Sequence, residues 1–165
     1  MISDETAMSD EANGRPSIPE AIAVFIVFTF LLHFAWEILQ APLFARMPMV
    51  SHWLATLVCL KATFGDVGIA LASFAVGAWW ERDWRWFVLP SNGALAAYVA
   101  TGVLITIVFE WYSVYWAARW SYSELMPIVP LLRVGLAPLL QWFALPLAVL
   151  FLLRCHRPRR GTRWL

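Results

Sequence analysis

AIAVFIVFTFLLHFAWEILQ, residues 21–40, decides the fold of this chain. The stretch contains one charged side chain, Glu37, and one histidine, His33. A helix of about 20 apolar residues, rising 1.5 Å per residue, spans the roughly 30 Å hydrocarbon core of a bilayer. The stretch therefore predicts a transmembrane helix with two ionisable groups in its second half.

Three more apolar stretches of similar length follow, in a chain of 165 residues that is 61% hydrophobic and 14% charged. Soluble domains are about half apolar and about a quarter charged. Strands of a membrane barrel alternate apolar and polar residues, whereas TGVLITIVF (101–109) does not. The sequence predicts an all-α polytopic membrane protein with four transmembrane helices in one bundle, at about 19–41, 52–79, 92–117 and 127–153.

Arginine positions predict the orientation of the bundle. Arg82 and Arg85 lie between the second and third helices, while Arg46 and Arg119 are the arginines of the other two connections. Five more follow the fourth helix: Arg154, Arg157, Arg159, Arg160 and Arg163. The positive-inside rule then places both termini in the cytoplasm, so we expect a multi-pass protein of a bacterial-type inner membrane.

The two tails differ in charge from the transmembrane domain, residues 17–153. Residues 1–16 are acidic and lack an apolar period, which predicts disorder. Residues 154–165 form a basic cytoplasmic tail. Basic clusters next to a membrane contact anionic lipids, so we expect membrane lipid and no nucleic acid as a partner.

Capping residues predict where several helices begin. The second helix begins near Ser51, and either Ser91 or Asn92 caps the third. Ser121 and Glu124 form a capping-box pattern that predicts a short interfacial helix before the fourth transmembrane helix.

Polar residues recur at helical spacing within these apolar stretches. His33, Glu37 and Gln40 lie at i, i+4 and i+7, on one face of the first helix. Asp66 belongs to a similar stripe on the second helix and Glu110 to one on the third. Charged groups inside a bilayer cost about 2.5–3.5 kcal/mol each on insertion scales, so they often mark functional sites.

Depth along each helix predicts which polar groups could meet. At 1.5 Å per residue, Lys61 and Arg133 lie about 10 Å below the outer membrane edge, and Asp66 and Gln141 about 20 Å below it. Lys61 is about 140° around the helix from Asp66, which leaves open whether the two share a site. We expect an outward-facing polar site in the outer half of the bundle.

Chemical type separates the candidate site residues into two groups. Acid–base groups form the candidate catalytic set: Glu37, Asp66, Glu110 and His33. Polar or aromatic neighbours form the candidate substrate-binding set: Trp36, Gln40, Lys61, Arg133 and Gln141. Each also has a structural interpretation, since ion pairs hold helices together and long basic side chains reach the interface.

The sequence leaves three kinds of function open. Acid–base chemistry on, or binding of, a lipid or isoprenoid is the leading hypothesis, because a carboxyl group that keeps its proton can act as a general acid. A proton-coupled transporter and a structural or accessory subunit of a membrane complex are the alternatives, and a homo-oligomer is compatible with each. We expect no cofactor, and no metal motif such as HExxH or CxxC is present.

Overall fold

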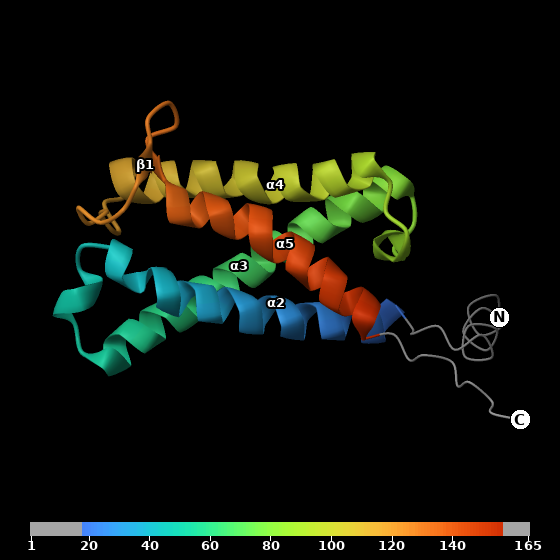
Figure 1. Ribbon diagram of the computed structural model, residues 1–165, viewed down its shortest axis with the longest axis horizontal. Coiled ribbons are helices and arrows are strands. Elements are labelled where there is room, and N and C mark those ends of the chain that lie inside the picture. The colour runs from blue at the N-terminus through green and yellow to red at the C-terminus, as the bar shows by residue number, and fades with distance from the viewer. Residues whose placement is uncertain (1–17, 157–165) are drawn as a thin grey trace, which may run out of the picture.

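The computed structural model describes residues 18–156, which form four long helices joined by short segments (Figure 1). The long helices are α2 (Ile18–Gln40), α3 (His52–Glu81), α4 (Asn92–Trp111) and α5 (Leu136–Cys155). The shorter elements are η1 (Ala41–Leu43), η2 (Met47–Met49), η3 (Trp86–Val88), the π-helical η4 (Tyr112–Trp116), β1 (Ile128–Val129) and β2 (Val134–Gly135). The predicted tail at 1–16 and most of the tail at 154–165 lie outside the described residues.

The four long helices are each long and apolar enough to cross a membrane. This confirms the predicted all-α class and its four candidate spans. The 30 residues of α3 extend for about 45 Å at 1.5 Å per residue, which exceeds a hydrocarbon core of roughly 30 Å. In Figure 1, α3 accordingly runs obliquely, and both α3 and α5 contact α2 and α4.

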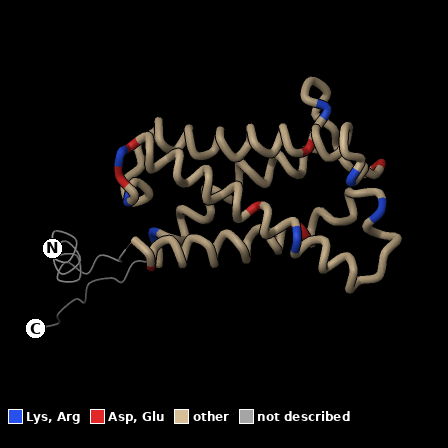
Figure 2. The backbone as a smooth tube through the Cα atoms, turned by 180° about the vertical axis from the view of Figure 1, so that it is seen from behind, with Lys and Arg blue, Asp and Glu red and all other residues tan. Residues whose placement is uncertain are grey.

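The helices define two ends of the bundle. The start of α2, the end of α5 and the α3–α4 connection lie at one end, which we call proximal (Figure 1). The α2–α3 and α4–α5 connections lie at the other end, which we call distal. Figure 2 shows that most Lys, Arg, Asp and Glu residues lie near these ends and that few lie between them.

Serine side chains begin two of the helices. The Ser51 hydroxyl oxygen accepts a hydrogen bond from the Leu54 backbone N–H at 3.3 Å, and that of Ser91 accepts one from Ala94 at 3.1 Å. Each bond satisfies one backbone N–H that has no partner within its helix. Both predicted starts are confirmed, and Ser91 is the cap of α4.

The start of α5 differs from the prediction. It begins at Leu136, nine residues after the expected start at 127. Instead, β1 and β2 form a small antiparallel hairpin in which Val129 pairs with Val134. Pro130 directly follows β1 and favours an extended conformation in the residue before it, so a helix cannot readily continue through this point.

The two distal connections are bound to each other. Phe44 and Tyr122 form an isolated antiparallel bridge, and the Ala45 backbone N–H donates to the Ser121 carbonyl at 3.0 Å. The short helix predicted from Ser121 and Glu124 is wrong, because this extended pairing uses backbone groups that a helix would need. Together the connections form a cover over the distal end of the bundle.

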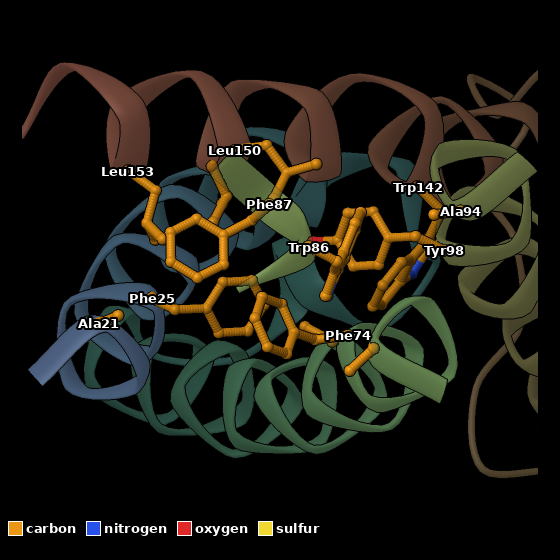
Figure 3. Packing of buried hydrophobic residues seen from close by; sticks show 13 residues of the cluster. Ala21, Phe25, Phe74, Trp86, Phe87, Ala94, Tyr98, Trp142, Leu150 and Leu153 are labelled. Atoms are coloured by element: carbon orange, nitrogen blue, oxygen red, sulfur yellow. The ribbon is translucent and has the colours of Figure 1, made fainter. Parts of the chain in front are cut away.

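Apolar and aromatic side chains fill the proximal part of the bundle (Figure 3). The Phe74 ring packs against Phe25 of α2 and against Trp86 of η3, with ring centres 4.8 and 5.4 Å apart. This apolar core comprises Ala21, Phe25, Ala70, Phe74, Ala78, Trp86, Phe87, Ala94, Tyr98, Trp142, Val149, Leu150 and Leu153. Polar side chains that face inward from the same helices lie beyond it, toward the distal end.

Candidate functional site

The predicted polar stripe of α2 faces the interior. His33 is 1% exposed and Gln40 is buried, while Glu37 is half-buried. The His33 ring packs against the indole of Trp142 on α5, with ring centres 5.1 Å apart. The i, i+4, i+7 spacing thus places these three side chains on the inward face of the helix, as the sequence predicted.

Side chains from three helices meet around His33. The Nε2 of Gln141 on α5 donates to His33 Nδ1 at 2.8 Å and to Asp66 Oδ2 at 2.9 Å. Asp66, on α3, also lies 3.3 Å from His33 Nδ1 through the same oxygen. These contacts connect α2, α3 and α5 through one hydrogen-bonded triangle.

The triangle continues along α2 toward the distal end. The Nε2 of Gln40 donates to Glu37 Oε1 at 2.6 Å and to Gln141 Oε1 at 3.3 Å. The indole Nε1 of Trp36 donates to Gln40 Oε1 at 3.1 Å. We call this connected set the polar cluster; its members are His33, Trp36, Glu37, Gln40, Asp66 and Gln141.

The chemistry of Trp36 fixes the direction of every hydrogen bond in the polar cluster. An indole N–H only donates, so the oxygen of the Gln40 amide must face it and the nitrogen must face away. That nitrogen then requires an oxygen from Gln141, whose own nitrogen turns toward His33 and Asp66. In neutral His33, Nδ1 is therefore the acceptor and the opposite ring nitrogen, Nε2, carries the hydrogen.

The polar cluster contains two carboxyl groups and one imidazole, and none of its members is lysine or arginine. Asp66 is 15% exposed and Glu37 is half-buried, whereas His33 and Gln141 are almost completely buried. Glu37 also interacts electrostatically with Asp66 and with Glu110. Of the ionisable members, the two carboxyl groups are thus more accessible than the imidazole.

Glu110 lies outside the hydrogen-bonded cluster, near the distal end of α4. Its Oε2 accepts a hydrogen bond from the Tyr122 hydroxyl at 2.5 Å and one from the Trp120 indole at 3.3 Å. Burial, followed by the charge of Glu110, raises the pKa of the Tyr122 phenol above its ordinary value. Tyr122 therefore keeps its proton and remains a donor to Glu110.

Two of the predicted substrate-binding residues are not members of the polar cluster. Lys61 is exposed on α3, on a different side of the helix from Asp66. Arg133 is exposed in the β1–β2 hairpin, and its guanidinium lies over the Tyr115 ring at 5.8 Å from the ring centre. The other seven predicted residues lie in the polar cluster or, for Glu110, within electrostatic reach of it.

Three contacts of the site could not be anticipated from helix spacing. Trp120 and Tyr122 reach Glu110 from the α4–α5 connection. Cys59 donates a weak hydrogen bond from Sγ to the Glu37 carbonyl at 3.6 Å, which joins α2 and α3. The one relevant sequence signal for the first two was the aromatic stretch after Glu110, which is equally typical of an interfacial belt.

Within residues 18–156, no group of three or more His, Cys, Asp or Glu side chains is arranged to hold a metal ion. Comparisons with protein-family models, curated proteins and solved structures find no significant match.

Proposed function

We propose that this protein is a multi-pass protein of a bacterial-type inner membrane, with both termini in the cytoplasm and the distal end facing outward. Four apolar helices and the excess of arginine around the proximal end support this orientation. We further propose that the polar cluster performs acid–base chemistry on a lipid or isoprenoid, or binds one.

The observation that carries the proposal is the pair of carboxyl groups around a buried histidine, with no lysine or arginine partner among residues 18–156. Separating a bare carboxylate from water in an apolar medium is costly unless a cation pairs with it. Here Glu37 and Asp66 interact electrostatically, and the sole group of the cluster that can become cationic is His33. A shared proton is the lowest-cost way to hold these groups together, and a retained proton is what a general acid donates.

We assign the catalytic roles of the polar cluster by the solvent exposure of its side chains. Half-buried Glu37 is the general acid, because it can reach a substrate that enters from the bilayer. Asp66 is the general base that accepts the proton, and His33, whose Nδ1 lies 3.3 Å from Asp66 Oδ2, is its neighbouring basic group. Transfer of a proton from Glu37 to an alkene carbon forms a carbocation, and loss of a neighbouring proton to Asp66 yields an isomer. The Trp36 ring, next to Glu37 in sequence, stabilises the cation through its π-face.

The test compares lipid extracts of membranes that contain equal amounts of the wild type, Glu37→Gln, Asp66→Asn and Glu124→Gln. Glu124 is an exposed acid of the α4–α5 connection and serves as a control for the loss of one carboxyl group. By mass spectrometry, we expect one lipid species to change in the wild type and in the control only. Identical lipid profiles in all four membranes would reject acid–base catalysis.

A structural or accessory role is the second candidate, because the triangle joins three helices and His33 is 1% exposed. In that case, Asp66→Asn lowers thermal stability without changing any lipid or bound molecule. A partner subunit of the membrane complex would then remain attached to the wild type and dissociate from the variant.

A further inference from the structure

Three hydroxyl groups buried in the helical segments have no hydrogen-bond partner within the described part of the chain: those of Thr29, Thr106 and Ser113. Other helix hydroxyls are satisfied locally. Thr63 and Ser73, for example, each donate to the carbonyl four residues earlier at 2.8 Å. Such local bonding is the usual arrangement for these residues in a helix. The three unpartnered hydroxyls therefore lack the bonds that their helices could have supplied.

Two of these hydroxyls share the inward face of the α4 segment with Glu110. Thr106 precedes Glu110 by four residues and Ser113 follows it by three, a spacing that places all three on one stripe. Thr106 is 6% exposed and Ser113 is completely buried. Ser113 also lies in the π-helical η4, a rare conformation that occurs often at functional sites.

The hydrogen bonds of Glu110 leave one of its oxygens for a further partner. Trp120 and Tyr122 both donate to Oε2. Because Oε2 already accepts two hydrogen bonds, a proton on the Glu110 carboxyl group is expected on the other oxygen, Oε1. Glu110 also interacts electrostatically with Asp66 and with Glu37. Glu110 is thus hydrogen-bonded to the α4–α5 connection and within electrostatic reach of the polar cluster.

We propose that ordered water molecules held by Thr106, Glu110 and Ser113 pass protons between the distal aqueous phase and the carboxyl groups of the polar cluster. This inference rests on the proposed acid–base function, because it names the route by which Glu37 regains a proton and Asp66 loses one between turnovers. The ligand of this second site is water, and the transferred species is a proton.

Helix geometry fits water in this place. Residues three or four apart on one helix face, as Thr106 and Glu110 are, have Cβ atoms about 5–6 Å apart. A water molecule about 2.8 Å from each of two polar atoms bridges up to roughly 5.6 Å. Each such water can accept from a hydroxyl and donate to Glu110, which meets the minimum of two polar partners for a buried water.

The proton balance of the route is simple. A proton leaves Oε1 of Glu110, and exchange through water delivers a proton to the carboxylate of Glu37 after that residue has protonated a substrate. Glu110 is then a carboxylate that retains its two donors on Oε2. Asp66 releases the proton that it took from the substrate through the same waters, and Glu110 takes a new proton from the distal aqueous phase. One proton enters and one leaves in each cycle, so no other reactant is needed.

The test measures hydrogen–deuterium exchange of the Glu110 carboxyl group by rapid-mixing infrared spectroscopy of the purified full-length protein. The Glu110 band is identified as the protonated-carboxyl band that Glu110→Gln removes. We expect exchange at least tenfold slower in Thr106→Val and in Ser113→Ala than in the wild type. Thr101→Val is the matched control, because the Thr101 hydroxyl is already satisfied by the Ala97 carbonyl at 2.7 Å.

Several outcomes would overturn the inference. One is exchange at the wild-type rate in both Thr106→Val and Ser113→Ala. Another is that Glu110→Gln removes no band. A third is a band that shifts with sodium concentration, which would place a cation beside Glu110. If Thr106→Val does not fold, the test uses Ser113→Ala, which should still exchange slowly. Thr106→Ser, which retains a hydroxyl, should exchange at the wild-type rate. No lipid is needed, so this result is independent of whether the lipid comparison succeeds.

Discussion

The indole Nε1 of Trp36 lies 3.1 Å from Oε1 of Gln40, and this hydrogen bond orients the polar cluster. Because an indole cannot accept, it fixes the direction of the Gln40 amide and, through it, that of Gln141. This bond therefore influences the hydrogen bonds of His33 and Asp66, although the Trp36 indole is hydrogen-bonded to neither residue.

Trp36→Phe should release this constraint. Removal of one hydrogen bond typically costs about 1 kcal/mol of stability, and the Gln40 amide becomes free to rotate. We expect the ¹⁵N signals of the His33 ring to change from a single Nε2–H tautomer in the wild type to a mixture in the variant. Trp53→Phe, which alters an exposed indole, should leave those signals unchanged. An unchanged tautomer in Trp36→Phe would contradict the orienting role.

Among the described glycines, Gly102 should be the least tolerant of a side chain. A Cβ on Gly102 would overlap the Trp142 ring, which itself packs against His33. We expect Gly102→Ala to lower the free energy of unfolding by about 1–3 kcal/mol, the typical cost of overpacking. The matched change Gly68→Ala meets no atom within 4 Å and should be neutral or stabilising. Thermal unfolding in detergent compares the two, and equal effects would contradict the packing described.

Alkaline pH should weaken the distal cover through Tyr122. Its pKa is raised in the folded protein by burial and by Glu110, above the ordinary value of 10.0. The folded state therefore binds the phenolic proton more tightly, and this stabilisation is complete below about pH 10 and is lost as the pH rises further. Tyr122→Phe should remove that part of the alkaline destabilisation. If the free energy of unfolding changed with pH in the same way in the wild type and in Tyr122→Phe between pH 8 and 11, this role of Tyr122 would be contradicted.

Cysteine labelling should establish the orientation. Cys155 is exposed near the proximal end and Cys59 is buried, so the chain already carries one reporter. A membrane-impermeant maleimide should label Cys155 in opened cells only. In a Cys155→Ser background, Glu124→Cys should be labelled in intact cells, because it lies on the distal cover. The reverse pattern would invert the proposed topology.

The sequence predicted the four helices well, since apolar length is a local property. The inward stripe of His33, Glu37 and Gln40 was also predictable from spacing alone. Depth along two separate helices correctly brought Asp66 and Gln141 to the same level, where they form a hydrogen bond.

Other features depend on tertiary contacts that no local pattern reveals. Lys61 and Asp66 are close in sequence, and which of them turns inward depends on how α3 packs against α2 and α5. Arg133 was expected inside a helix because its neighbours are apolar, yet the β1–β2 hairpin, with Pro130 in its turn, delays the start of α5. The donors to Glu110 come from a connection whose extended conformation is set by pairing with Phe44.

The most direct test of the central claim is the set of hydrophobic molecules that remain bound through purification. Mass spectrometry should find one lipid or isoprenoid bound in stoichiometric amount to the wild type and to Glu124→Gln. The same molecule should be absent from, or chemically altered in, Glu37→Gln and Asp66→Asn, since these remove the carboxyl groups of the polar cluster. Retention of identical molecules by all four proteins would contradict the claim that the polar cluster is a lipid site.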